Sequence, residues 1–147
     1  MNPIPSAYLI LLRQEQIFLM KRQNTGYEDG NYGVIAGHVE AGETFVDAMI
    51  REAQEEAGLR LTAEDFSFSL LMHRYAQTSN PPERLDVFFT AIEEKNFEPS
   101  NMEPHKCAEI GWFPVDDLPT NCIAFIKYAI EQVRQGQHYA EYGWSAD

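Results

Sequence analysis

Short runs of hydrophobic residues, broken by polar and glycine-containing segments, fill the first quarter of the chain. Residues 8–12 and 17–22 are apolar runs on either side of a short Gln-Glu segment, so they predict a β-hairpin. Residues 23–32 are rich in Asn, Thr, Gly and Asp, which is typical of a loop. Residues 33–36 then predict a short strand leading into the next element.

The pattern changes to a helical period between residues 44 and 58. Thr44 is followed three residues later by Asp47, a capping box that uses the shorter acid, and Gly58 suits the left-handed residue that closes a helix. Between these ends, apolar residues recur at helical spacing at Val46, Met49, Ile50, Ala53 and Ala57. The segment predicts a helix with one core face and one acidic face.

The second half of the chain predicts further strands and one more helix. Residues 66–75 and 85–91, which flank the polar connector 77–84, predict a second antiparallel pair. Residues 110–113 predict a last strand, and apolar positions between 123 and 133 predict an amphipathic helix ending near residue 136. The elements together predict a mixed sheet between helices.

The tail, residues 137–147, holds more aromatic side chains than a solvated chain end needs: Tyr139, Tyr142 and Trp144. We expect the tail to pack across its own domain, because buried aromatics are ordinary core material. A contact between two copies of the chain is the alternative.

Length and composition narrow the class of protein. A chain of 147 residues with 44% hydrophobic residues is long enough for one core and too short for two ordinary domains, so residues 1–147 are expected to form a single domain. The apolar run near the start is too short to cross a membrane and lacks the layout of a signal peptide. We therefore expect a cytoplasmic protein with no membrane partner.

Charge and cysteine content exclude other classes. The net charge of −12 argues against binding to a nucleic-acid duplex, which depends on Lys and Arg displacing counterions. Cys107 and Cys122 fit no zinc spacing and provide no disulfide framework, so reduced thiols are expected. An acidic protein that acts on polyphosphates would need metal ions and a few well-placed cations.

Three acids on the first predicted helix form the main chemical feature of the chain. Glu52, Glu55 and Glu56 stand at i, i+3 and i+4, so they share one arc of the helix surface. Two carboxylates about 6 Å apart repel by roughly 3 kcal/mol at an effective dielectric near 20, and an Arg51–Glu55 pair returns only about 0.2–0.5 kcal/mol. A divalent cation would offset the repulsion, and oxygen-only ligands favour Mg²⁺ or Mn²⁺.

The surrounding residues give the segment a resemblance to a known family. The Nudix hydrolase signature reads G-x5-E-x7-R-E-U-x-E-E-x-G-U, where U is a bulky aliphatic residue, and the matching positions here are Gly37, Glu43, Arg51, Glu52, Glu55, Glu56, Gly58 and Leu59. Ala53 is a small occupant of the first aliphatic position, and His38 follows Gly37 where many MutT-like members have a second glycine. The resemblance implies an α/β fold, the Nudix-type α/β/α sandwich with a mixed β-sheet between helices.

The same resemblance implies roles for the signature residues. Gly37 would offer its backbone carbonyl to a metal, and Glu52, Glu55 and Glu56 would be side-chain ligands, with Glu52 also able to orient or deprotonate the attacking water. Arg51 and Glu43 would hold the loop and helix together. Such a cluster suits hydrolysis of phosphoanhydrides.

Residues outside the signature carry weaker implications. Glu103 lies in a segment that looks like one subgroup of the family, where a loop acid serves as metal ligand or base. Arg22 matches a position where related proteins often direct a basic residue toward the phosphates, although a solvated arginine is an alternative. His38 could touch phosphate or metal, with a neutral variant at a tolerant position as the alternative. Tyr75 lies about as far beyond the signature as a tyrosine of some diadenosine polyphosphate hydrolases, although a tyrosine in an aromatic strand usually serves packing.

Three functions follow from these observations. The leading hypothesis is a MutT-like enzyme that converts a nucleoside triphosphate, for example an oxidised one such as 8-oxo-dGTP, to monophosphate and pyrophosphate. The second is a hydrolase of dinucleoside polyphosphates or nucleotide sugars. The third, from another class, is a nucleotide-binding regulatory module without turnover. In each case the partner is a small nucleotide, and the sequence leaves monomer or homodimer open.

Overall fold

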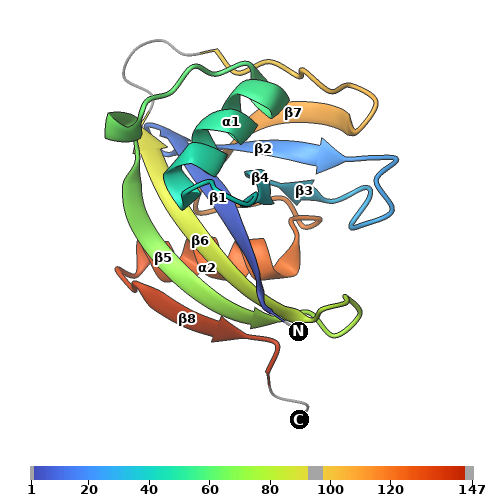
Figure 1. Ribbon diagram of the computed structural model, residues 1–147. Coiled ribbons are helices and arrows are strands. Elements are labelled where there is room, and N and C mark those ends of the chain that lie inside the picture. The colour runs from blue at the N-terminus through green and yellow to red at the C-terminus, as the bar shows by residue number, and fades with distance from the viewer. Residues whose placement is uncertain (1, 93–97, 145–147) are drawn as a thin grey trace.

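The computed structural model describes residues 2–92 and 98–144, whose strands form one eight-stranded mixed sheet with a helix on each face (Figure 1). The helices are α1 (Phe45–Ala57) and α2 (Ala124–Arg134), and a short 3-10 helix, η1, covers Ala63–Asp65. The strands are β1 (Ile4–Arg13), β2 (Gln16–Arg22), β3 (Tyr32–Gly33), β4 (Ile35–His38), β5 (Ser67–Tyr75), β6 (Glu83–Ile92), β7 (Cys107–Pro114) and β8 (Tyr139–Tyr142). The predicted α/β/α arrangement is confirmed.

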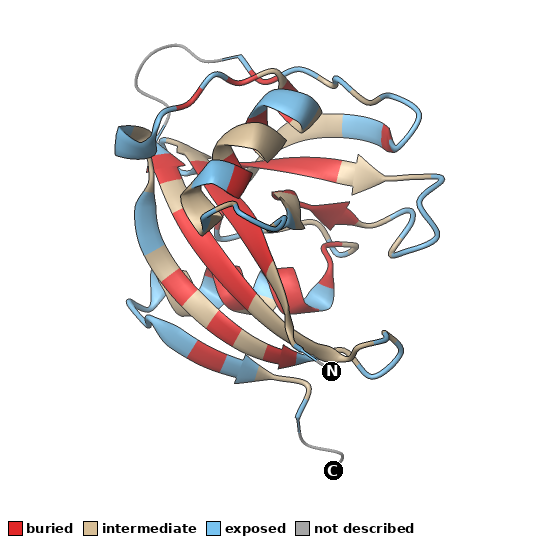
Figure 2. Ribbon diagram, viewed as in Figure 1, coloured by how far each residue is buried: buried red, intermediate tan, exposed pale blue. Residues whose placement is uncertain are grey.

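Strand β1 lies at the centre of the sheet and explains the apolar run near the start of the chain. One edge of β1 pairs in parallel with β6, and the other edge pairs in antiparallel fashion with β2 and β4. Tyr8 and Ile10 point into the core on the α2 side, whereas Leu9 and Leu11 point into the core on the α1 side. A strand covered on both faces needs apolar residues at successive positions, and Figure 2 shows β1 buried along most of its length.

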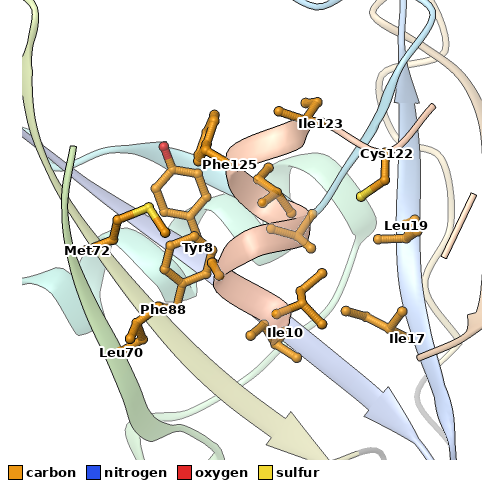
Figure 3. Close-up of a cluster of buried hydrophobic side chains, with 14 of the residues drawn as sticks. Tyr8, Ile10, Ile17, Leu19, Leu70, Met72, Phe88, Cys122, Ile123 and Phe125 are labelled. Atoms are coloured by element: carbon orange, nitrogen blue, oxygen red, sulfur yellow. The ribbon is translucent and has the colours of Figure 1, made fainter. Parts of the chain in front are cut away.

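The two helices differ in the size of the side chains that they bury against the sheet. On the α2 side, Tyr8 stacks on Phe88 with ring centroids 4.5 Å apart, and Phe125 meets Tyr8 edge-on at 5.8 Å (Figure 3). On the α1 side, the helix buries Ala48, Met49, Ala53 and Ala57. These small residues allow α1 to lie close to the sheet, which brings its acidic face near the end of β4.

Most predicted elements are present with slightly different bounds. The hairpin forms as β1 and β2, the second antiparallel pair as β5 and β6, the last predicted strand as β7, and the second helix as α2. The prediction of one strand over residues 33–36 was wrong. The chain changes neighbours at Val34, so Gly33 pairs with β2 and Ile35 pairs with β1, and two short strands result.

The tail contains a strand that the sequence analysis missed. Strand β8 pairs in parallel with β5, and Ala140 is buried there. Beyond it, the Trp144 indole N–H donates to the His73 carbonyl at 2.8 Å, and its ring lies 5.1 Å from that of Tyr75. The expected packing of the tail within the domain is confirmed for its described part, while residues 145–147 lie outside the described residues. In that described part of the chain, neither helix is long and apolar enough to cross a membrane.

Candidate active site

Helix α1 is fixed at both ends by the residues that predicted it. The Thr44 hydroxyl accepts the Asp47 N–H at 3.0 Å, and the Asp47 carboxylate accepts the Thr44 N–H at 3.0 Å, which completes the capping box. Gly58 closes the helix with a φ of 67°, and its N–H points back to the carbonyls of Ala53 and Gln54. The acids between these ends therefore have defined directions.

One arginine holds three acidic side chains within 3.5 Å. The Arg51 guanidinium donates to both oxygens of Glu43, at 2.7 and 2.9 Å, and also contacts the carboxylates of Glu52 and, at 3.5 Å, Glu55. It further donates to the His38 carbonyl at 3.1 Å. We call Arg51, Glu43, Glu52 and Glu55 the Arg51 cluster. The hydrogen bonds from Arg51 lower the pKa of Glu43 to about 2, so Glu43 is a fixed carboxylate that ties the loop to the helix.

Glu56 is in a different environment, although it lies only one residue beyond Glu55. Its Oε2 atom is buried and has no hydrogen-bond partner in the described part of the chain. Burial raises the pKa of Glu56 well above its usual range, the nearby Glu52 and Glu103 add to the rise, and a hydrogen bond from the Ala36 N–H opposes it. Glu56 is therefore an unbalanced acid that a cation would stabilise.

Gly37 is required by the close approach of Glu52. A Cβ atom placed on Gly37 would lie only 2.6 Å from Cγ of Glu52, a separation that no real side chain tolerates. The end of β4 therefore touches the Glu52 side chain directly. Any larger residue at position 37 would displace that carboxylate.

A cavity of about 520 Å³ lies beside these acids. Its lining includes five of the eight residues that the sequence singled out for metal or substrate binding: Arg22, Gly37, His38, Glu56 and Glu103. In the described part of the chain it is also lined by five of the eleven Lys and Arg residues, Lys21, Arg22, Arg74, Arg84 and Lys106, against two acids. In a protein of net charge −12, this concentration of cations favours a polyanionic ligand.

Two residues predicted to bind substrate, Arg22 and Tyr75, lie in different places. Arg22 lines the cavity, and its Nε donates to the Tyr27 carbonyl at 2.7 Å. Tyr75 is not part of the lining and packs on Trp144 instead. The structure thus does not bring Tyr75 to the cavity, because the side chains of β5 alternate and Tyr75 points away from the face that carries Arg74.

Sequence reasoning missed four of the cavity cations: Lys21, Arg74, Arg84 and Lys106. A usable signal existed for one of them. Arg74 continues the buried alternation of Leu70 and Met72 along β5, so a charged residue stands at a core-facing position. A buried charge at such a position needs a partner or a function.

The donor set fits a hard divalent cation, although the side chains are not gathered into a finished site. Across residues 2–92 and 98–144, no group of three or more His, Cys, Asp or Glu side chains is close enough to hold a metal ion. Glu56 lies close enough to Glu52 and Glu103 for them to raise its pKa, and all three side chains provide only oxygen atoms, one of which is the unpartnered oxygen of Glu56. Oxygen-only ligands of this kind suit Mg²⁺ and Mn²⁺.

The fold and the site define a class of α/β proteins that carry a carboxylate-rich helix next to a mixed sheet. The chain belongs to the Nudix family, because the family model for the NUDIX domain matches residues 3–133. Members of this family generally use divalent metal ions.

Relatives of known sequence or structure support this assignment. The chain is 33% identical over 118 residues to the NAD-capped RNA hydrolase NudC of Citrobacter koseri, a match that covers 78% of this chain and 40% of that protein. The chain thus spans about two fifths of the length of that relative. The crystal structure of a MutT NUDIX hydrolase from Burkholderia pseudomallei matches with a TM-score of 0.79 and 27% identity, over 90% of this chain and 99% of that chain.

A third similarity concerns the fold alone. The NUDIX domain of Shewanella oneidensis NrtR, solved in complex with ADP ribose, matches with a TM-score of 0.73 and 15% identity, over 92% of this chain and 88% of that chain. The same sheet and helices are thus present in proteins whose sequences have diverged widely.

Proposed function

We propose that this protein hydrolyses a phosphoanhydride bond in a nucleoside diphosphate derivative, and that its substrate is a nucleoside triphosphate, which it converts to the monophosphate and pyrophosphate. The observation that carries the proposal is the cavity, which combines five cationic side chains with the unpartnered buried oxygen of Glu56. Cations alone would serve any anion. A carboxylate beside these cations provides the oxygen ligands that Mg²⁺ or Mn²⁺ prefers, which suits a substrate that arrives with such an ion.

Each residue of the signature has a part in this proposal. Glu52, Glu55, Glu56 and the carbonyl of Gly37 would hold the cation, with Glu103, from the turn before β7, as a further ligand. When bound, the cation neutralises the bridging phosphates and lowers the pKa of a water molecule. Glu52 would orient that water or take its proton. Arg51 and Glu43 keep the loop and the helix at a fixed distance, so they act through Glu52.

The cations of the cavity would hold the phosphates. Lys21, Arg22 and Lys106 come from β2 and from the turn before β7, and they lie on the same cavity as Glu56. His38, at the end of β4, is an exposed lining residue whose carbonyl is already bound by Arg51. These side chains would bind the phosphates, and the carboxylates with their cation would position the reacting bond.

A dinucleotide substrate is the second candidate. The relative from Citrobacter koseri is named for hydrolysis of NAD-capped RNA, and a dinucleotide contains the same pyrophosphate linkage. A regulatory module that binds without turnover is the third, since the NrtR domain was solved with ADP ribose. The complete set of acids on α1 speaks against the third candidate, because binding alone does not need an activated water.

Product analysis tests the proposal. The protein would be incubated with Mg²⁺ and nucleoside triphosphates, including 8-oxo-dGTP, and in parallel with dinucleoside polyphosphates, NAD and nucleotide sugars. Release of pyrophosphate from triphosphates supports the first candidate, and two mononucleotide products from a dinucleotide support the second. Binding without any product in wild-type protein would contradict both. Glu56→Gln removes the carboxylate with the unpartnered oxygen and should lower product release. Glu131→Gln, an exposed change on α2, is its matched control.

A further inference from the structure

Two arginines stand at paired positions of neighbouring strands on one wall of the cavity. Arg74 of β5 and Arg84 of β6 are directly opposite each other in the antiparallel register, and both line the cavity. Paired residues of this kind have Cβ atoms about 5 Å apart on one face of the sheet, and like charges there are destabilising. The pair therefore needs negative charge close to it.

A buried acid provides part of that charge and holds one of the two arginines. Arg74 is only 6% exposed, and its Nε donates to the Asp86 carboxylate at 2.6 Å. Its Nη2 donates to the Tyr8 hydroxyl at 3.3 Å, and the ring of Phe125 covers the guanidinium, with 3.7 Å between Cζ and the ring centroid. Arg74 is therefore oriented before any ligand binds.

Arg84 lacks such a partner in the described part of the chain. Its side chain is half-buried, its buried Nε forms no hydrogen bond there, and none of the ion pairs found there includes it. Glu83, the neighbouring acid on β6, pairs with His73 instead, with 2.7 Å between Oε2 and Nε2. Burial raises the pKa of Asp86, and the charges of Arg74 and Arg84 both oppose that rise, so a single carboxylate serves two guanidinium groups. This wall of the cavity thus carries an excess of positive charge.

The excess charge favours an anionic ligand group over a neutral one. A neutral carbonyl oxygen would accept an N–H from Arg84 but leave the charge uncompensated, and an uncompensated charge away from water is costly. A phosphate group supplies both negative charge and several acceptor oxygens, and guanidinium groups bind phosphate through paired N–H donors. A guanidinium has five N–H groups, and Arg74 uses two of them in the hydrogen bonds to Asp86 and Tyr8, so both arginines have donors left for one ligand.

We propose that Arg74 and Arg84 form a phosphate subsite, in which one phosphate group of the substrate is bound between the two guanidinium groups while Asp86 keeps Arg74 in place. The inference deepens the proposed function and rests on it for the substrate, since a nucleoside triphosphate brings a chain of phosphates into this cavity. The subsite uses side chains of β5 and β6 alone, so it binds phosphate with or without the cation. The bound phosphate also offsets the repulsion between the two arginines.

Inorganic pyrophosphate in the presence of a chelator tests the subsite without substrate or metal. Calorimetry on the wild-type protein should show binding, and Arg84→Gln should weaken it at least about 10-fold, as expected for hydrogen bonds between charged groups. Arg84→Lys and Arg74→Lys each keep the charge but lack the paired donors, so their affinities should lie between these two. Arg60→Gln, an exposed arginine outside the cavity lining, is the control and should bind as the wild type does. No binding by the wild type, or equal binding by Arg84→Gln, overturns the inference.

Two further measurements separate phosphate binding from other roles of Arg84. Without ligand, Arg84→Gln should resist urea as well as the wild type or better, because a like charge opposite Arg74 is removed. A clear loss of stability would mean that Arg84 serves the fold, and it overturns the inference. Inosine and adenosine, which carry no phosphate, should not distinguish Arg84→Gln from the wild type. A loss of affinity for inosine alone would mean that Arg84 contacts the base, which also overturns the inference.

Kinetics separate this inference from the proposed function. With a nucleoside triphosphate and Mg²⁺, Arg84→Gln should raise KM at least about 10-fold and change kcat by less than about 3-fold, because the phosphate is held equally before and during the reaction. A fall in kcat at unchanged KM overturns the inference. If the wild type hydrolyses no nucleotide but its pyrophosphate binding depends on Arg84, the proposed function fails and the inference stands. If triphosphates are hydrolysed while pyrophosphate binds equally to the wild type and to Arg84→Gln, the function stands and the inference fails.

Discussion

Two acidic environments on one helix differ in how their charges are balanced. In the Arg51 cluster, three carboxylates contact the same guanidinium, and the pKa of Glu43 falls to about 2 because Arg51 donates to both of its oxygens. One position beyond the cluster, Glu56 has a buried oxygen without a partner in the described part of the chain, and its pKa is raised by burial. Glu43, just before helix α1, and Glu56, near its end, thus have pKa values shifted in opposite directions.

The difference separates a carboxylate that holds the loop on the helix from one that is suited to bind a cation. A carboxylate whose two oxygens are both bound by an arginine, as in Glu43, gains little from a metal ion, whereas a buried carboxylate with an unpartnered oxygen, as in Glu56, gains much, because its desolvation has not been offset. Glu43 and Arg51 therefore keep the loop and the helix together. Glu56 stores an unfavourable interaction that a cation and a phosphate would relieve on binding, which is a reason for its place on the cavity.

Replacing Glu56 should give the largest of the expected effects. A small effect would contradict the contrast between Glu56 and the Arg51 cluster. Glu56→Gln removes a cation ligand, so kcat/KM should fall by about 100-fold or more, since metal stabilisation of the transition state is worth several kcal/mol. The metal-free protein should be equally or more stable toward urea, because a buried charge is lost. Glu131→Gln should change neither quantity. Near-normal turnover together with lower stability would mean that Glu56 serves the fold.

Gly37→Ala tests whether the position of Glu52 matters as much as its charge. The added methyl group would collide with the Glu52 side chain and displace its carboxylate, and a shift of about 1 Å near the reacting atoms costs on the order of 100-fold in rate. We expect loss of activity and of Mg²⁺ affinity in a folded protein. Gly111→Ala on β7, where the nearest atom is Phe113 Cε2 at 3.3 Å, is the control. Unchanged kinetics for Gly37→Ala would contradict the proposed role of Glu52.

Arg51→Lys should have a smaller effect, because it removes no cation ligand. Lysine keeps the positive charge but cannot bind both oxygens of Glu43 while also reaching Glu52. A loss of about 10-fold in kcat/KM is expected, in the range typical of residues that orient ligands. Higher Mg²⁺ concentration should restore part of it. A loss as large as that of Glu56→Gln would mean that Arg51 contacts the substrate.

The sequence predicted the fold well where local signals and core burial agree. Helix α1 begins and ends where Thr44 and Gly58 indicated, because capping depends on neighbouring residues alone. Strand β8 was missed because its four residues are held by parallel pairing with β5, which lies far away in sequence. The break at Val34 was missed for the same reason, since pairing partners decide it.

Prediction of the site was limited in a similar way. The signature identified Gly37, Arg51 and the acids of α1, because their spacing along one segment is visible in the sequence. The spacing could not distinguish Glu55, whose side chain is 53% exposed, from Glu56, which reaches the cavity. Arg74 was missed because it meets the cavity only after four strands have come together.

The pH dependence of stability gives the smallest effect and the sharpest test of the contrast. Glu43 has a folded-state pKa of about 2, below its usual 4.5, so its contribution to stability is complete above pH 4.5 and is lost as pH falls toward 2. Glu56 has a raised folded-state pKa, so the unfolded chain gives up its proton first and stability falls as pH rises above 4.5. Urea unfolding at a series of pH values, with a chelator present, should show that Glu43→Gln reduces the acid-side loss and Glu56→Gln reduces the fall at higher pH. If the two variants gave parallel curves, the carboxylates would share one environment, and the distinction between a neutralised cluster and an unbalanced acid would have to be abandoned.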